Sequence, residues 1–219
     1  MMVFANRSGA GRLLADRLSA YAHRDDVIVL ALPRGGVPVA YEIAEHLGVP
    51  LDVLIVRRIG TPGMENVAMG AVASGGIVVI NQDVVSTARV LGTEMQYAIE
   101  LERDEVERRE KAYRSGRLPL DVKAKTVILV DDGAATGATM RAAVLALRRM
   151  SPARIVVALP VAAEDTTEEL KRDADDFVCL STPHDFYAVS LWYADFPQIS
   201  DDEVRELLGR AAELSEVTA

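Results

Sequence analysis

The sequence predicts an α/β fold: a mostly parallel twisted sheet with helices on both of its faces. Two continuous apolar runs, Val27 to Leu32 and Thr126 to Val130, have the length of strands, and such runs are typical of strands buried on both faces of a parallel sheet. Each run is followed by a turn that contains glycine and then by a segment of helical periodicity. This alternation continues to about Leu180, which favours one α/β unit.

The composition is that of one soluble domain spanning residues 1–219, with half of its residues hydrophobic. A net charge of −9 opposes nucleic acid binding as the main task. No apolar run approaches the length of a membrane span, and residues 1–10 carry Asn6 and Arg7 where a signal peptide needs an apolar block. We therefore expect a cytoplasmic protein. The single cysteine, Cys179, excludes an internal disulfide and lies in a strand-like run, as a core thiol would.

The first half of the chain alternates in the same way. Leucines at helical spacing predict a helix over Phe4 to Arg24, which Asn6 or Ser8 can cap. After the first strand, helical periodicity returns over Val37 to Leu47 and stops at Gly48. The next elements expected are a strand from Leu51 to Val56, a loop from Gly60 to Asn66, and a hairpin of Ala68 to Ala73 with Gly76 to Ile80.

A long charged helix comes next. Thr93 and Gln96 form a capping-box pattern at its start, and opposite charges lie four residues apart in three pairs, which supports a solvated helix: Asp104 and Arg108, Glu105 and Arg109, Glu107 and Lys111. Beyond Val130 the remaining elements expected are a strand, a helix, a strand and a terminal helix, over Arg154 to Pro160, Thr166 to Asp173, Phe177 to Leu180 and Asp201 to Leu214.

The stretch Thr126 to Arg141 says most about function. Its apolar strand ends at two adjacent carboxylates, Asp131 and Asp132, and a helix follows after seven residues that are all small or hydroxyl-bearing: Gly133, Ala134, Ala135, Thr136, Gly137, Ala138 and Thr139. Such a strand, turn and helix place unpaired N–H groups and the positive end of a helix at one point, where a phosphate binds well. Two capping aspartates in a plain connection are the simpler interpretation, but Thr-Gly-x-Thr after them exceeds what a cap requires.

VILVDDGAATGATM resembles the phosphoribosyl pyrophosphate (PRPP) motif of type I phosphoribosyltransferases. The resemblance implies that Asp131 and Asp132 hold the ribose 2′ and 3′ hydroxyls, and that the loop from Ala134 to Thr139 wraps the 5′ phosphate. Gly133, between the two, is also expected to bind PRPP. The chemistry agrees, because carboxylates accept hydrogen bonds from hydroxyls and repel phosphate. Hypoxanthine and guanine enzymes of this family carry an aspartate where this chain has Ala135, so the motif is nearer to the adenine type and the acceptor stays open.

A second loop follows the first predicted strand, at Pro33, Arg34, Gly35 and Gly36. Alone, it would be interpreted as a plain crossover turn; beside the first motif it resembles the pyrophosphate loop of the same family. The two glycines permit close backbone approach and unusual dihedral angles, and Arg34 can make bidentate phosphate contacts. Arg57 and Arg58 are expected at the carboxyl end of the next strand, where open α/β sheets bind ligands, with one of them facing the pyrophosphate.

The resemblance also implies a hood over the base, built from the chain ends at about 1–24 and 181–219 around a core of about 27–180. The segment Pro183 to Pro197 is rich in aromatic residues, which usually pack a terminus onto a core, but in this family an aromatic ring stacks on the base. The candidates here are Phe186, Tyr187, Trp192 and Tyr193. A mobile closing loop is expected at Ser115 to Arg117 or in the helix before it.

The activity implied is transfer of phosphoribosyl from PRPP to a nitrogenous base or small amine, with release of pyrophosphate. Arg34 and Arg57 would stabilise the leaving group, and Mg²⁺ would bind through PRPP, with water-mediated contact to Asp131 and Asp132 as one option. A homo-oligomer, as a dimer, is expected. Two alternatives stay open: a PRPP-sensing regulator without turnover, and another phosphate-binding α/β enzyme such as a hydrolase that uses Asp131.

Overall fold

The computed structural model describes residues 3–217, without the side chains of residues 65, 66 and 215–217. Its centre is a five-stranded sheet in the order β2-β1-β6-β7-β8, in which every neighbouring pair is parallel. Each residue of the first three of these strands in the sheet order is buried. The predicted α/β class is therefore confirmed, with strands β1 (Val27–Ala31), β2 (Leu51–Val53), β6 (Thr126–Val130), β7 (Arg154–Val161) and β8 (Asp176–Ser181).

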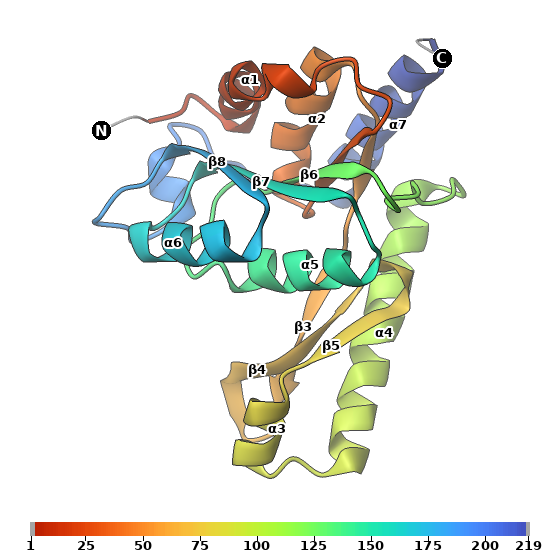
Figure 1. Ribbon diagram of the computed structural model, residues 1–219, viewed down its shortest axis with the longest axis vertical. Coiled ribbons are helices and arrows are strands. Elements are labelled where there is room, and N and C mark those ends of the chain that lie inside the picture. Colours follow the sequence, from red (N-terminus) through yellow and green to blue (C-terminus); the bar gives the residue numbers. More distant parts are fainter. Residues whose placement is uncertain (1–2, 218–219) are drawn as a thin grey trace.

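Helices cover both faces of this sheet, because alternate residues of each buried strand point to opposite sides. In β1, Val27, Val29 and Ala31 join one hydrophobic cluster, whereas Ile28 and Leu30 join the other. Figure 1 shows one group of helices on each face: α1 (Arg7–Arg17), α2 (Gly36–Leu47) and α7 (Asp201–Val217) against α5 (Ala138–Arg149) and α6 (Glu164–Asp173). Among the described residues, no helix is both long enough and apolar enough to cross a membrane.

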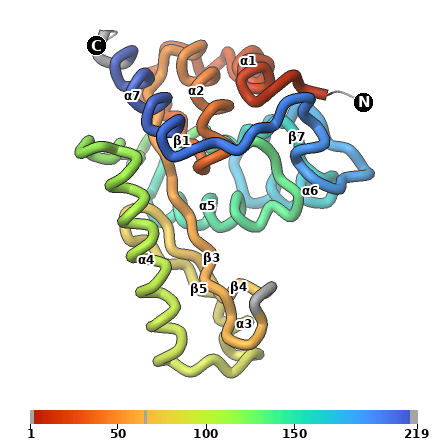
Figure 2. The backbone as a smooth tube through the Cα atoms, turned by 180° about the vertical axis from the view of Figure 1, so that it is seen from behind, coloured from red at the N-terminus to blue at the C-terminus, as the bar shows by residue number. Residues whose placement is uncertain are grey.

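A second, antiparallel sheet projects from this core as an arm (Figures 1 and 2). It has the order β3-β4-β5, and the long helix α4 runs along it. The predicted hairpin around Ser74 is confirmed, since Gly70 to Ala73 pair antiparallel with Ile77 to Ile80. The arm consists of β3 (Val56–Thr61), β4 (Met64–Ala73), β5 (Ile77–Ile80), α3 (Gln82–Ala88) and α4 (Gly92–Arg114).

The strand predicted over Leu51 to Val56 is wrong at its end. The parallel strand β2 stops at Val53, and Val56 already belongs to β3 of the other sheet. Leu54 and Ile55 between them are buried, so the apolar run passes from one sheet to the next without a polar residue to mark the change. Consequently Arg57 and Arg58 lie within an arm strand and not at the carboxyl end of a parallel one.

The end of α1 and the start of α4 also differ from the prediction. Asn6 caps α1 by accepting a hydrogen bond from the Gly9 N–H at 2.8 Å, but the helix ends at Arg17 and gives way to a short 3-10 turn. The long helix α4 begins at Gly92, and Glu94, rather than the predicted Thr93 and Gln96 pair, closes its first turn by accepting from the Leu91 N–H at 3.0 Å.

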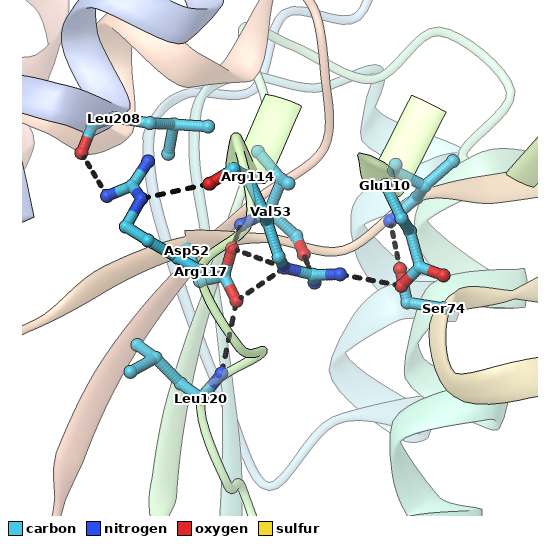
Figure 3. Close-up of polar contacts among 9 residues, drawn as sticks. Asp52, Val53, Ser74, Glu110, Arg114, Arg117, Leu120 and Leu208 are labelled. Carbon is cyan, nitrogen blue, oxygen red and sulfur yellow. Dashed lines mark hydrogen bonds and ion pairs between the residues drawn. The ribbon is translucent and has the colours of Figure 1, made fainter. Parts of the chain in front are cut away.

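The arm is fixed to the core by a buried ion pair between α4 and β2 (Figure 3). Arg114 Nε donates to both carboxylate oxygens of Asp52 at 3.1 Å, and its Nη2 donates to the Val53 carbonyl at 3.0 Å. Backbone N–H groups of Val53 and Leu120 donate to the same carboxylate. Both charged side chains are about nine-tenths buried, so the geometry of the arm depends on the full set of partners.

We expect Asp52→Ala to destabilise the protein by about 3–5 kcal/mol, because it removes one of the two carboxylates that pair with the buried Arg114 guanidinium and leaves Nε without its partner, with only Glu110 remaining at 2.7 Å. The matched control is Glu107→Ala, which removes an exposed partner of Lys111 at 3.8 Å in the same helix and should cost less than about 1 kcal/mol. Urea unfolding followed by circular dichroism measures both. Equal stability of the two variants would contradict the role given to the buried pair.

Candidate functional site

The site lies where the chain leaves β1 and β6. These two strands pair in parallel over five residues, from Val27 with Thr126 to Ala31 with Val130, and the Leu32 N–H donates to the Val130 carbonyl at 2.8 Å just beyond the last pair. From β1 the chain moves to β2 on one side, whereas β7 and β8 follow β6 on the other. The loops after β1 and β6 therefore flank the switch point of the sheet, where ligands of open α/β sheets bind.

The two predicted loops are in direct contact at their glycines. A Cβ atom on Gly35 would lie 2.1 Å from Asp132 Oδ2, and one on Gly36 would lie 2.7 Å from the Val130 carbonyl oxygen. Gly35 has an ordinary helical backbone with φ −60° and ψ −33°, so this glycine provides space and not, as predicted, an unusual dihedral angle. The structure thus brings the Pro33 to Gly36 loop against the acidic pair.

The acidic pair lies in a confined environment. Asp131 Oδ1 accepts a hydrogen bond from the Asp132 N–H at 2.9 Å. Burial, together with the neighbouring Asp132 carboxylate, raises the pKa of Asp131 well above its ordinary value. Burial also raises the pKa of Asp132, and Arg7 opposes this rise. Two crowded carboxylates of this kind favour hydrogen-bond donors and cations as neighbours, which suits ribose hydroxyls.

The loop after the acidic pair is anchored at Ala134 and open beyond it. Ala134 is buried and pairs with Ala162, and its N–H donates to the Val161 carbonyl at 2.9 Å. Gly137, with φ +64°, caps α5, whereas Ala135, Thr136 and Thr139 are exposed. The hydroxyl groups of the predicted phosphate loop therefore lie at the surface beside the first turn of α5, which also contains Ala138, and the geometry suits an anion.

The Ala135 carbonyl accepts a hydrogen bond from Thr166 Oγ1 at 2.6 Å. Thr166 lies in the first turn of α6, so this helix supports the loop from behind. A Cβ atom on Gly137 would lie 2.6 Å from Thr166 Cγ2. The phosphate loop is thus held in one conformation by both the end of β7 and the start of α6.

The arginines predicted to face the pyrophosphate contact different parts of the protein. Arg34, in the glycine loop, forms an ion pair with Asp201 at the start of α7, with 3.6 Å between Nη1 and Oδ1. Tyr113 of α4 donates to the same carboxylate at 2.7 Å, and burial raises the pKa of Tyr113 to about 12. Arg57 instead pairs with Glu102 of α4 at 2.7 Å, and Arg58 is exposed on β3.

The two ends of the chain pack together beside the site. The Phe4 N–H donates to the Trp192 carbonyl at 2.8 Å, and a small cluster joins Phe4 to buried Trp192 and Tyr193. The Tyr193 hydroxyl donates to the main-chain carbonyl of Asp132. Phe186 stacks on Trp192, with ring centroids 6.3 Å apart, whereas Tyr187 is 85% exposed. Of the four aromatic candidates, Tyr193 reaches the acidic pair directly.

Arg7 is a site residue that sequence reasoning missed. It is the first residue of α1 and only 7% exposed. Its Nε donates to Asp132 Oδ2 at 2.8 Å, its Nη1 donates to the Pro197 carbonyl at 2.7 Å, and its guanidinium lies 3.6 Å from the centroid of the Phe196 ring. No local pattern marks this residue, because its partner lies 125 positions away in the sequence.

Mg²⁺ could be held here only in part by protein groups. Over the residues that the structure describes, no group of three or more His, Cys, Asp or Glu side chains could hold a metal ion. Asp131 and Asp132 offer the oxygen atoms that Mg²⁺ prefers, but Arg7 already engages one of them. This donor set fits an ion carried mainly by ligand phosphates, with water between the ion and the acidic pair.

A family model of the phosphoribosyl transferase domain matches residues 6–195. The chain belongs to the phosphoribosyl transferase family. The match includes both loops at the switch point together with Arg7 and the aromatic segment up to Asp195. In this phosphoribosyl transferase domain, the Asp131 loop lies at the switch point of the parallel sheet.

Two relatives resemble this phosphoribosyl transferase domain over most of its length. A crystal structure of TT1426 from Thermus thermophilus is 41% identical, with a TM-score of 0.85, and covers 94% of this chain and 98% of that one. A protein of Mycobacterium tuberculosis named "putative phosphoribosyl transferase" is 41% identical over 211 residues. The match covers 96% of this chain but 47% of that protein, so the chain spans about half the length of this relative.

A relative with a different name matches a shorter part of the chain. A "Bifunctional protein PyrR" of Chloroflexus aurantiacus is 38% identical over 131 residues, which is 58% of this chain and 65% of that protein. Parts of this chain thus resemble proteins that carry different names.

We expect Gly35→Ala to destabilise the protein by about 1–3 kcal/mol, because the new methyl group would overlap Asp132 Oδ2. The control is Gly209→Ala in α7, where a Cβ atom would meet open space and should stabilise the helix by about 0.5–1 kcal/mol. Urea unfolding gives both values. A Gly35→Ala variant as stable as the wild type would show that the two loops are not in contact.

Proposed function

We propose that this domain binds PRPP across the β1 and β6 loops and transfers its phosphoribosyl group to a nitrogenous base or small amine. The observation that carries the proposal is the packing of Gly35 and Gly36 against the acidic pair. A loop suited to pyrophosphate and a loop suited to a ribose phosphate thereby lie side by side at the switch point of the sheet. A single ligand with phosphates at both ends of a ribose matches this arrangement.

In the proposed reaction, the lone pair of an acceptor nitrogen forms a bond to C1 of the ribose. The bond between C1 and the pyrophosphate oxygen breaks, the electron pair leaves with pyrophosphate, and the acceptor nitrogen loses its proton to solvent. Asp131 and Asp132 would hold the ribose hydroxyls, and the residues from Ala135 to Thr139 would hold the 5′ phosphate. Catalysis would depend on positioning and on neutralising the leaving group.

The pyrophosphate would lie beside the N-terminus of α2, where Arg34 and the backbone of Gly35 and Gly36 could neutralise it. Arg34 would exchange its Asp201 partner for the phosphate oxygens. Arg57 keeps a part in this proposal only if its pair with Glu102 opens. When bound with PRPP, Mg²⁺ would supply further neutralisation of the phosphate charge.

A PRPP-sensing role without turnover is the second candidate. One observation favours it: both arginines proposed to stabilise the leaving group are paired with carboxylates of the protein itself, Arg34 with Asp201 and Arg57 with Glu102. Such a sensor would bind PRPP by the same loops and would not release pyrophosphate.

Pyrophosphate release distinguishes these two roles. Incubation with PRPP, Mg²⁺ and a panel of purines, pyrimidines and pyridine carboxylates should give acceptor-dependent pyrophosphate if the domain is a transferase. Tight PRPP binding without release, measured by calorimetry, would favour the sensor. A protein that binds no PRPP would exclude both.

We expect Asp132→Asn to weaken PRPP binding by about 10-fold to 100-fold while the fold persists, because a carboxylate accepts stronger hydrogen bonds from hydroxyls than an amide does. Asp185→Asn, an exposed change in the aromatic segment, is the control and should bind PRPP as the wild type does. Calorimetry measures the affinities, and circular dichroism checks the fold. Unchanged affinity of Asp132→Asn would remove this residue from the ribose site.

A further inference from the structure

The charged side chain of Arg7 is almost completely buried. Arg7 begins α1 and reaches across to the end of β6, and its side chain is 8% exposed against 15% for that of Asp132. An ion pair removed from water in this way costs desolvation free energy unless its remaining donors are also satisfied. The pair is therefore unlike the exposed pairs of α4, which stabilise little.

Three contacts fix the guanidinium in one orientation. Besides the bond from Nε to Asp132, Nη1 donates to the Pro197 carbonyl at 2.7 Å, and the Phe196 ring covers the group with 3.6 Å between Cζ and the ring centroid. An arginine stacked on a ring and bonded along two edges loses little freedom when it binds a carboxylate. The direction of the Asp132 side chain is thus set from outside the PRPP motif.

The segment that follows β8 also contacts Asp132. The Tyr193 hydroxyl donates to the Asp132 main-chain carbonyl, and the Tyr193 and Phe196 rings are 5.0 Å apart. The backbone of Asp132 is therefore held by Tyr193, and its carboxylate is held by Arg7. Residues from the N-terminal helix and from the segment after β8 thus meet at this single acidic residue.

Asp132 needs such support because of its neighbours. The Asp131 carboxylate lies beside it, and the backbone of Gly35 lies so close that a Cβ atom there would overlap Oδ2. A free carboxylate in this position would be repelled by Asp131 and could rotate away from the ribose site. A carboxylate can accept about four hydrogen bonds, so the bond from Arg7 leaves capacity for a ribose hydroxyl.

We propose that Arg7 is a positioning residue of the ribose site, which fixes the Asp132 carboxylate in the orientation that receives a ribose hydroxyl. This inference deepens the proposed function and rests on it. It assigns a role in PRPP recognition to the N-terminal helix, outside both loop motifs. It also predicts that the effect of Arg7 is specific to the ribose, since the candidate site residue to which it donates is Asp132 of the acidic pair and not a residue of the glycine loop.

The test compares Arg7→Gln, Arg7→Lys and the control Arg12→Gln. Arg12 lies on the same helix and forms an exposed pair with Glu42 of α2 at 3.0 Å. Calorimetry at a fixed Mg²⁺ concentration measures binding of PRPP, ribose 5-phosphate and pyrophosphate to each protein, and thermal unfolding checks that each variant is folded. Arg7→Lys keeps the charge, so it stays informative if Arg7→Gln does not fold.

Arg7→Gln should bind PRPP and ribose 5-phosphate at least about 10-fold more weakly, in line with the loss of one charge-assisted hydrogen bond. Its pyrophosphate affinity should stay within about twofold of the wild type, which corresponds to less than one hydrogen bond. Arg7→Lys should recover part of the lost ribose affinity, because one donor and the charge remain. Arg12→Gln should bind all three ligands as the wild type does.

Two results would overturn the inference while the proposed function stands. One is an equal loss for all three ligands, which would indicate general damage to the site. The other is unchanged or tighter PRPP binding by Arg7→Gln, which would show that Arg7 is dispensable or blocks the ribose site. A wild-type protein that binds no PRPP would instead overturn the proposed function itself, and the inference with it.

Discussion

The parallel pairing of β1 with β6 determines where every candidate residue of the two loops lies. The pairing runs over five residues and continues to the Leu32 N–H. The two strands therefore end at the same level of the sheet, and the loops after them lead into helices on opposite faces. The two loops can then pack against each other because Gly35 and Gly36 have no Cβ atom. A slip of one residue in this register would exchange the residues that β1 directs to the two faces of the sheet and would separate the glycine loop from the acidic pair.

The electrostatics of the proposed PRPP site follow from local groups and not from the whole chain. A protein of net charge −9 repels a polyanion at long range, so binding of PRPP requires positive groups placed at the loops themselves. The starts of α2 and α5 and the side chain of Arg34 provide them. Arg7 differs from these groups, since it forms an ion pair with a carboxylate of the protein itself, Asp132.

The sequence predicts the parts of this site that are encoded locally. Both loops follow a buried strand and precede a helix, so the residues from Pro33 to Gly36 and from Asp131 to Thr139 could be found by pattern. Arg57 could not be placed, because the apolar run before it passes from one sheet to another without a break. Arg7 gave no signal at all, because only the tertiary packing of α1 brings it to Asp132.

The aromatic segment illustrates the same limit. The sequence predicts that its rings pack a terminus or cover the base, and Trp192 and Tyr193 are buried against Phe4, yet no spacing rule distinguishes the exposed Tyr187 from the hydrogen-bonded Tyr193. The division of the arm from the core was likewise hidden, since Asp52 and Arg114 are 62 positions apart. Local chemistry thus predicts the loops, whereas the groups that hold them depend on long-range packing.

The most direct test of the two-loop site is a competition experiment with the two halves of PRPP. Ribose 5-phosphate and pyrophosphate are titrated into the protein separately and then one in the presence of the other, and PRPP is titrated for comparison. If the β6 loop holds the ribose phosphate and the β1 loop holds the pyrophosphate, both halves bind together and PRPP binds more tightly than either. Mutual displacement of the two halves from one common site, or an absence of PRPP binding, would contradict the account.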